Sequence, residues 1–348
     1  MIQISNTHIS RFHKPFIIAE MSGNHNQSLE RALMMVDVVA KTGAQALKLQ
    51  TYTADTITID KQDGEFFIED PKSLWKGESL YNLYKKAYTP WEWHEPIMNR
   101  CKEKGIICFS SPFDFTAVDF LEDLKVPAYK IASFENIDLP LIRKVAQTGK
   151  PVIISTGMAN VQEIAEAVQT IRGTGNEQII LLKCTSTYPA NPENSNILTI
   201  PHLRDLFQCE VGLSDHTMGL GVAVASVALG ATIIEKHFTI SREEGGVDSA
   251  FSMEPDEMTA LVIESERAWQ ALGKITYGPT EKEKSSMIFR RSLYCIKDIM
   301  AGEEITYQNV RSIRPGKGLE PKYLDIIMGK KVKIDIRRGT GISWEMIG

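Results

Sequence analysis

Short runs of aliphatic and β-branched residues alternate with amphipathic helical stretches along most of this 348-residue chain, and this alternation restricts the possible folds more than any other feature. It predicts a parallel sheet, because parallel neighbours need a helical crossover. Eight units within about 275 residues match a closed (β/α)₈ barrel, the TIM-barrel fold, better than an open doubly wound sheet. The eight predicted strands span residues 15–20, 46–50, 106–110, 128–132, 152–155, 179–184, 210–214 and 232–237.

A dinucleotide-binding doubly wound fold is the main alternative, and its glycine motif is incomplete. Gly219 and Gly221 precede a predicted helix, but Val224 occupies the place of the third glycine. The pair also comes late in the chain, whereas the motif normally opens the first βαβ unit. The sequence therefore favours the barrel.

The alternation ends near residue 273, and the chain then changes character. The segment 274–290 is polar and predicts a linker, whereas 291–348 combines short strand-like runs with turn glycines. We therefore expect a TIM-barrel domain at 1–273, a linker at 274–290 and a small β-rich domain at 291–348. Within the barrel, residues 51–90 form an excursion longer than a normal βα loop, and long loops in compact domains are usually functional.

Composition and charge argue against several classes of protein. The net charge is −5, whereas a nucleic-acid-binding protein would normally carry a basic stripe. The N-terminal segment has no apolar signal-peptide core, and no apolar run is long enough to cross a bilayer. The five cysteines are odd in number and form no CxxC pair, which is typical of free thiols in a reducing cytosol. We expect a cytoplasmic protein that binds neither nucleic acid nor membrane.

Two lysines lie near the carboxyl ends of predicted strands, in apolar surroundings that are unfavourable for a charge without an anionic partner. Lys48 lies in ALKLQ, where Gln50 shares its face, and Lys130 lies in AYKIAS. The carboxyl ends of TIM-barrel strands build the active site, so both lysines are expected there. A structural ion pair is one interpretation, and a binding site for a phosphate or carboxylate ligand is the other. Hydroxyl donors that would complete an anion site are Ser111, Ser133, Ser155 and Ser214.

Two histidines end consecutive strands, His216 in GLSDH and His237 in IIEKH. Neighbouring strands lie roughly 5 Å apart, so the two imidazoles are expected to be close enough to bind one divalent metal ion. Glu20, at the end of the first strand, would add an oxygen ligand. Such a set suits Mn²⁺, Co²⁺ or Zn²⁺. A pair of structural histidines is the alternative.

Other chemistries are less well supported. Glu135 lies two residues after Ser133 and is a candidate to move a proton or to bind a substrate hydroxyl. Lys130 could instead form a Schiff base, which would make the chain a class I aldolase. The paired histidines have no role in that chemistry and weigh against it. Motifs of serine hydrolases and P-loop proteins do not occur.

Several segments resemble the sialic acid synthase family, in the same order and over nearly the whole chain. They are IAEMSGNHNQS, LKLQTYTADT, FSSPFD, AYKIASFENID, PVIISTGMAN, CTSTYPA, VGLSDHTMG and ALGATIIEKHFT. The C-terminal IRPGKGL resembles the antifreeze-like (SAF) domain that ends those enzymes. The resemblance implies a barrel followed by a SAF domain.

The resemblance also implies a reaction. C3 of phosphoenolpyruvate attacks the aldehyde of an open-chain acylated amino sugar, water adds at C2, and phosphate leaves with cleavage of the C–O bond. The implied cofactor is a divalent metal, Mn²⁺, Mg²⁺ or Co²⁺, with His216 and His237 as ligands. The implied contacts of phosphoenolpyruvate are Lys48, Lys130, Ser133, Ser155, Ser186 and Ser214. Those around the sugar and the reacting centre are Glu20, Gln50, Glu135, Tyr188, Asp248 and Arg314, and the catalytic set is Glu20, Lys48, Gln50, Lys130 and Glu135.

Three segments resemble the pseudaminic acid synthases of that family: SLWKGESLYNLYKKAYTPWEWH, Phe134 in ASFE, and VDSAFSMEP. Phe134 would offer apolar area to the methyl group of a 6-deoxy sugar. The implied sugar is 2,4-diacetamido-2,4,6-trideoxy-L-altrose. Synthesis of N-acetylneuraminic or legionaminic acid is the alternative within the family, and a barrel that binds sugar without catalysis is the alternative from another class.

Finally, the resemblance implies a homodimer in which the SAF domain reaches the barrel of the partner. Arg314 would then contact the sugar in the partner's site, a role that suits its forked guanidinium. Geometry alone does not decide this point, because a flexible linker of about 18 residues could also return to its own barrel.

Overall fold

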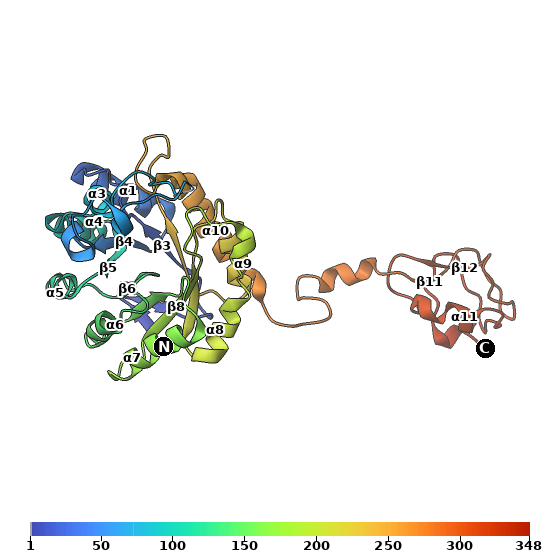
Figure 1. Cartoon of the computed structure of the whole chain (residues 1–348). Coiled ribbons are helices and arrows are strands. Elements are labelled where there is room, and N and C mark those ends of the chain that lie inside the picture. The colour runs from blue at the N-terminus through green and yellow to red at the C-terminus, as the bar shows by residue number, and fades with distance from the viewer. Residues whose placement is uncertain (1, 72) are drawn as a thin grey trace. The chain divides into compact units, whose positions relative to one another are not determined.

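The structure is a computed structural model that describes residues 2–71 and 73–348. The chain divides into two compact units, Met1–Gly273 and Lys274–Gly348, which are described separately. The first unit is the expected TIM barrel (Figure 1). No helix in the described part of the chain is long and apolar enough to cross a membrane.

Eight parallel strands close the barrel in the order β10-β3-β4-β5-β6-β7-β8-β9. Each ends within two residues of its predicted position, because the buried aliphatic runs that mark the strands also fill the barrel interior. The strands are β3 (Phe16–Glu20), β4 (Ala46–Thr51), β5 (Ile107–Pro112), β6 (Tyr129–Ile131), β7 (Val152–Ser155), β8 (Ile179–Cys184), β9 (Glu210–Ser214) and β10 (Ile233–His237).

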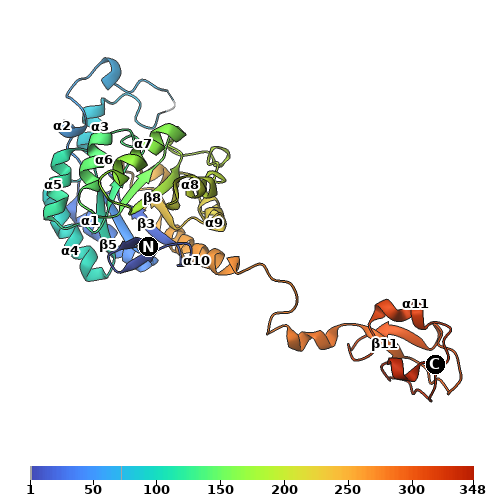
Figure 2. The same cartoon turned by 90° about the horizontal axis from the view of Figure 1, so that it is seen from below.

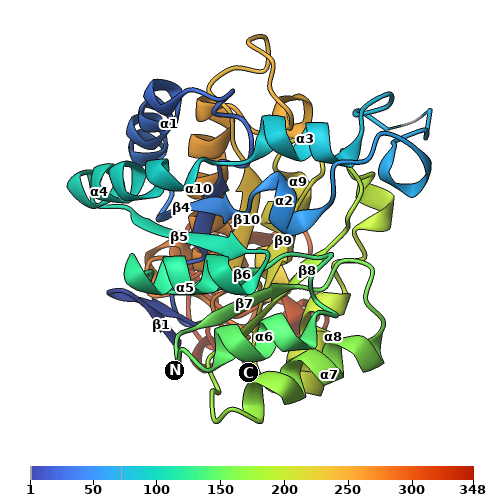
Figure 3. The same cartoon turned by 60° about the vertical axis from the view of Figure 1, so that its left-hand side comes forward.

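A helix follows each strand and covers the outside of the barrel; Figure 3 shows α5, α6 and α7 outside the neighbouring strands. Local signals set the helix ends. Ser28 caps the first helix by accepting a hydrogen bond from the Arg31 amide, and Gly43 ends that helix at a φ of 85°. The helices are α1 (Leu29–Thr42), α4 (His94–Lys104), α5 (Phe115–Asp123), α6 (Leu139–Ala146), α7 (Val161–Arg172), α8 (Thr199–Phe207), α9 (Gly221–Ala228) and α10 (Pro255–Leu272).

An N-terminal hairpin, absent from the sequence-based prediction, precedes the barrel strands. It pairs β1 (Ile2–Ile4) with β2 (Thr7–Ile9), and its Ile4 and Ile9 join the barrel core. Strands of three residues are too short to show a clear alternation of polar and apolar residues.

The excursion at residues 51–90 contains α2 (Ala54–Ile57) and α3 (Leu80–Ala87), and Figure 2 shows it projecting from one end of the barrel. Buried histidines hold both of its ends. His94 Nε2 lies 2.8 Å from Thr51 Oγ1, and His25 Nε2 lies 3.3 Å from Thr89 Oγ1. Burial lowers the pKa of each imidazole to about 4, so both are neutral near pH 7. The excursion is therefore anchored to the barrel at its two ends.

The second unit has its own apolar core, formed around Leu293, Ile299, Ile305 and Ile342. Its antiparallel pair joins β11 (Ser292–Cys295) to β12 (Val310–Ile313), and α11 (Leu324–Ile327) is a short helix. A 3₁₀ helix, Lys284–Phe289, lies in the segment predicted as a linker.

Candidate active site

The carboxyl ends of the barrel strands surround a cavity of about 400 Å³. Residues two apart on one strand face it together, as Lys48 and Gln50 do on β4 and Glu235 and His237 do on β10. Its polar lining consists of Ser22, Lys48, Gln50, Lys130, Ser133, Glu135, Ser155, Tyr188, Ser214, His216, Glu235, His237 and Asp248. Most residues of the predicted site thus lie around one space.

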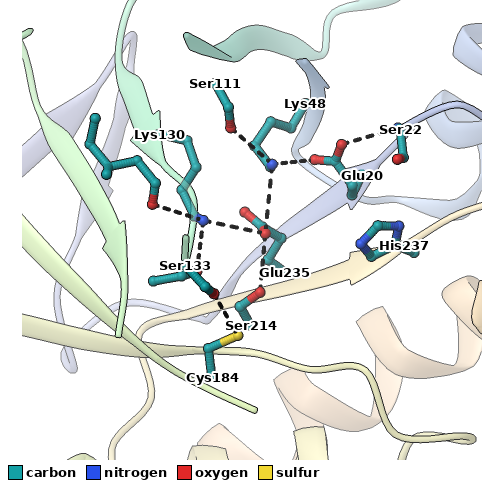
Figure 4. Close-up of polar contacts among 12 residues, drawn as sticks. Glu20, Ser22, Lys48, Ser111, Lys130, Ser133, Cys184, Ser214, Glu235 and His237 are labelled. Atoms are coloured by element: carbon teal, nitrogen blue, oxygen red, sulfur yellow. Dashed lines mark hydrogen bonds and ion pairs between the residues drawn. The ribbon is translucent and has the colours of Figure 1, made fainter. Parts of the chain in front are cut away.

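Two lysines and two glutamates form a buried charged centre, called here the Lys–Glu quartet: Glu20, Lys48, Lys130 and Glu235 (Figure 4). Lys48 Nζ contacts Glu20 and lies 3.7 Å from Glu235 Oε1. Lys130 Nζ lies 3.8 Å from the same oxygen. All four side chains are at most 6% exposed, so water screens their charges poorly.

Serine hydroxyls complete the surroundings of the quartet. Lys48 donates a hydrogen bond of 3.2 Å to Ser111 Oγ, and Lys130 donates one of 2.7 Å to Ser155 Oγ. Ser214 donates to Glu235 Oε1 at 3.1 Å. The lysines thus form ion pairs, and they also lie beside hydroxyl groups on the wall of a cavity, where the binding of an anionic ligand stays a prediction.

The two carboxyl groups of the quartet differ in acidity. Burial raises the pKa of Glu20 to about 7, although the charge of Lys48 opposes this rise. Burial also acts to raise the pKa of Glu235, but the charges of Lys130 and Lys48 outweigh it and the pKa falls. Burial lowers the pKa of the Lys130 amine. Near pH 7, Glu235 is thus the stable anion, and Glu20 can gain or lose a proton.

His216 and His237 face the same cavity, with ring centroids 5.4 Å apart. His216 Nδ1 lies 2.8 Å from the Thr185 carbonyl oxygen, which fixes that ring. The buried Nδ1 of His237 has no hydrogen-bond partner among the residues that the structure describes. Burial lowers the pKa of His237 well below its usual range, so the ring is neutral and its lone pair is free.

These features fit two imidazole ligands of one metal ion with further coordination positions left open. The three-ligand set that includes Glu20 is not assembled, because Lys48 engages the Glu20 carboxylate. Among the described residues, no group of three or more His, Cys, Asp or Glu side chains is arranged to hold a metal.

Lys236, on the outward face of β10, supports the loop that carries His216. Its buried Nζ donates hydrogen bonds to Asp215 Oδ2 at 3.0 Å, to the Gly219 carbonyl at 3.2 Å and to the Thr217 carbonyl. Asp215 also accepts from the amide and the hydroxyl of Thr217, both at 3.0 Å. One strand therefore presents His237 and, through Lys236, holds the loop of the other histidine.

Asp248 reaches the cavity from the loop after β10. Its Oδ2 accepts a hydrogen bond from Ser22 and lies 3.7 Å from His237 Nδ1. The fully buried Asn24 holds this loop, since its Nδ2 donates to Ser252 Oγ at 2.8 Å and its Oδ1 accepts from the Asp248 amide at 3.2 Å. The loop positions of Ser22 and Asn24, in SGNHN, are thus close to Asp248 despite their separation in sequence.

The remaining predicted residues lie in different surroundings. Tyr188 packs on His216 with ring centroids 4.5 Å apart, and burial raises the pKa of Glu135 to about 7. Phe134 lines the cavity but is 59% exposed. Ser186 does not line the cavity, and its Oγ lies 3.9 Å from Cys184 Sγ. Arg314 is an exposed residue of the second unit.

Two residues near the centre of the site were absent from the predicted set. Glu235 pairs with both lysines; its position two residues before His237 could have indicated that it faces the cavity, but not which cations it meets. Cys184 lies 3.3 Å from Ser133 Oγ. Burial acts to raise the pKa of its thiol, but the hydrogen bond and charge of His216 and the hydrogen bond of Ser133 lower it to about 6. A single buried cysteine gives no such signal in the sequence.

A TIM barrel with paired imidazoles and with lysines and hydroxyl groups around one cavity is typical of an enzyme that acts on an anionic substrate. Comparison with known proteins identifies the family. Residues 35–277 match the model of the NeuB family, and residues 290–348 match that of the SAF domain. The chain belongs to the NeuB family. The resemblance found in the sequence, and the barrel followed by a SAF domain, are thereby confirmed.

The chain is similar to particular members of that family. It is 42% identical to a pseudaminic acid synthase of Campylobacter jejuni, over 98% of both chains. It is 34% identical to an N,N'-diacetyllegionaminic acid synthase of Legionella pneumophila, over 95% of this chain and 94% of that one. The crystal structure of the N-acetylneuraminic acid synthetase from Leptospira borgpetersenii, in complex with citrate, matches with a TM-score of 0.72 and 32% identity, over 82% of this chain and 94% of that chain.

From the contacts of the quartet, we expect Lys48→Met and Lys130→Met each to weaken the binding of phosphoenolpyruvate about ten- to hundredfold. A hydrogen bond to a charged group is worth about 1.5–3 kcal/mol, and each substitution also leaves two buried carboxylates with a single cation. Titration calorimetry measures the dissociation constants. Lys183→Met is the matched control, since Lys183 also ends a strand but bonds to the Cys184 carbonyl and does not line the cavity.

An unchanged dissociation constant in both quartet variants would mean that the lysines serve the fold alone. The same proteins can be treated with borohydride in the presence of substrate. A covalent adduct on Lys130 would favour the Schiff-base chemistry of an aldolase.

Proposed function

We propose that this chain condenses phosphoenolpyruvate with 2,4-diacetamido-2,4,6-trideoxy-L-altrose to form pseudaminic acid and phosphate. The observation that carries the proposal is one cavity that combines two buried lysines and their serines with two adjacent imidazoles. The higher identity to pseudaminic acid synthases, 42% against 34% for a legionaminic acid synthase, favours this sugar.

Phosphoenolpyruvate carries a phosphate and a carboxylate, and the lysines suit both. Lys48 and Lys130, with Ser133, Ser155 and Ser214, supply cationic and hydroxyl donors on the floor of the cavity, and Ser111 holds Lys48 from behind it. To bind the ligand, the lysines must exchange part of their contact with Glu20 and Glu235 for contact with the ligand. Ser186 is a less direct contributor, because it reaches the site only through Cys184.

The reaction needs groups that hold and release protons. A bond forms between C3 of phosphoenolpyruvate and the aldehyde carbon, and the aldehyde oxygen takes up a proton to become a hydroxyl. Water adds at C2 and loses a proton, and the C2–O bond to phosphate breaks. Glu20 and Glu135, each with a pKa of about 7, suit these transfers near neutral pH.

A divalent metal held by His216 and His237 would polarise the aldehyde oxygen. Mn²⁺, Mg²⁺ and Co²⁺ are the candidates. Asp248 and Tyr188, which lie against the two imidazoles, hold those rings in place and offer oxygen atoms to the hydroxyl groups of the sugar. Gln50, on the face of Lys48, is positioned to donate to the sugar from the floor.

The proposal is tested by incubating purified protein with phosphoenolpyruvate, Mn²⁺ and a panel of sugars, then measuring phosphate release and product mass. The proposal expects the highest kcat/KM with the 6-deoxy diacetamido sugar. Preference for N-acetylmannosamine or for the legionaminic precursor would instead make the chain an N-acetylneuraminic or legionaminic acid synthase. If no sugar in the panel leads to phosphate release, a barrel that only binds sugar would be favoured.

The same assay also tests the requirement for a metal ion. His237→Ala should abolish metal binding, measured by calorimetry with Mn²⁺ alone, and should reduce activity by several orders of magnitude while the circular dichroism spectrum stays native. His202→Ala is the control, since His202 lies in α8, away from the cavity. Full activity of the wild type in excess chelator would refute the metal requirement.

We further propose a homodimer in which Arg314 of one chain completes the site of its partner. Large apolar side chains are exposed in loops that follow β6, β7 and β9, at the end of the barrel where the cavity opens: Phe134, Ile137, Met158 and Met218. Exposed apolar groups gathered around a cavity favour burial against another protein surface. The guanidinium of Arg314 suits the recognition of two sugar or acetamido oxygens.

Subunit complementation tests the dimer. Inactive Lys130→Ala and inactive Arg314→Ala proteins are mixed under conditions that exchange subunits. If the SAF domains are swapped, one site of each mixed dimer carries neither defect, so a substantial fraction of activity returns. A mixture that stays inactive, with exchange verified by mass, would show that each Arg314 serves its own barrel.

A further inference from the structure

The cavity has two unlike halves. The charged side chains of its lining come from the strands and from the loops after β6, β9 and β10, and none comes from the excursion at residues 51–90. The opposite wall is mostly apolar, and most of it comes from this excursion. Its members are Tyr52, Ile57, Ile68, Trp75, Leu80, Leu83, Tyr84 and Ala87, with Phe113 beside them.

The chemistry of the two substrates assigns a half to each. Phosphoenolpyruvate needs donors for its phosphate and carboxylate, and the apolar wall offers almost none, so it belongs on the lysine floor. The aldehyde carbon of the sugar must meet C3 of phosphoenolpyruvate near the same floor. The far end of the sugar chain therefore faces the apolar wall.

Trp75 contacts the far side of the cavity. Its Nε1 donates a hydrogen bond of 3.1 Å to the carbonyl of Val247, the residue before Asp248. Its ring lies 5.9 Å from that of Tyr188. The indole thus joins the excursion to the loop of Asp248 across the cavity, and its ring is half-buried rather than free in solvent.

The segment around Trp75 is fixed at its base. Phe67 and Ser79 form an antiparallel bridge, and the Ile68 amide donates to the Glu78 carbonyl at 2.9 Å. The excursion as a whole is tied to the barrel through His94 and His25. The indole is therefore held in position before any ligand binds, which lowers the entropic cost of recognition.

We propose that Trp75 is a specificity-determining residue that selects sugars with a methyl group, rather than a hydroxymethyl group, at the end remote from the aldehyde. The inference rests on the proposed function. A hydroxyl placed against the Trp75 ring would lose water without gaining a partner there, because the indole N–H already donates to Val247, whereas a methyl group would gain apolar contact. Phe134 is the competing residue, but more than half of its surface is exposed.

The test compares two substrates that differ in one oxygen atom: the 6-deoxy diacetamido sugar and its 6-hydroxy counterpart. The ratio of their kcat/KM values is measured for the wild type, Trp75→Ala and Trp75→Phe. An apolar pocket discriminates such a pair by on the order of 10- to 200-fold. We expect Trp75→Ala to reduce the ratio at least tenfold, with the KM for phosphoenolpyruvate unchanged. Trp75→Phe keeps a ring but not the hydrogen bond to Val247, so it should retain part of the preference.

Trp91→Ala is the matched control. Trp91 is also half-buried and also donates Nε1 to a backbone carbonyl, that of Tyr52, but it stacks on Phe120 and does not line the cavity. Its ratio should equal that of the wild type. An unchanged ratio in Trp75→Ala, the same loss in Trp91→Ala, or a loss only in Phe134→Ala would overturn the inference. Absence of phosphate release by the wild type with every sugar would instead refute the proposed function.

Discussion

The rest of the site depends on the burial of four charges at the centre of the barrel. Removing a carboxylate or an ammonium ion from water costs several kcal/mol, and the mutual attraction of the Lys–Glu quartet offsets that cost only with good geometry. Four strands supply the quartet: Glu20 from β3, Lys48 from β4, Lys130 from β6 and Glu235 from β10. A buried charged centre of this kind contributes little to the stability of the fold. It is well suited to hold two cations ready for an anionic ligand.

The arrangement around the quartet follows from the alternation of side chains along each strand, which point in turn into and out of the barrel. On β10, Glu235 and His237 point inward, and Lys236 between them points outward and holds the loop of His216. The loops after β3 and β10 are joined through Asn24, and the excursion is joined to the second of them through Trp75. The polar chemistry of the floor and the apolar wall are thus parts of one connected structure.

Much of this could be predicted from the sequence. Buried parallel strands appear in the sequence as aliphatic runs, and polar residues at their ends mark the cavity. The barrel and the positions of Lys48, Lys130 and the two histidines could therefore be predicted. The role of Glu235 was missed because a carboxylate in IIEKH gives no sign of which cations it meets across the barrel. Trp75 and Asn24 act between segments distant in sequence, and periodicity contains no information on such contacts. The short hairpin at Ile2–Ile9 lacks the length needed for a pattern.

The central claim is that an anionic substrate replaces carboxylates as the partner of the two lysines. Calorimetry of phosphoenolpyruvate binding at pH 8, in buffers of different ionisation enthalpy, measures this directly. The phosphate is already fully ionised at that pH, since its second pKa is about 6. An anion bound beside Glu20, whose pKa is about 7, raises that pKa further. The account predicts net uptake of up to about one proton per site, reduced in Glu20→Gln. Binding without proton uptake in the wild type would contradict it.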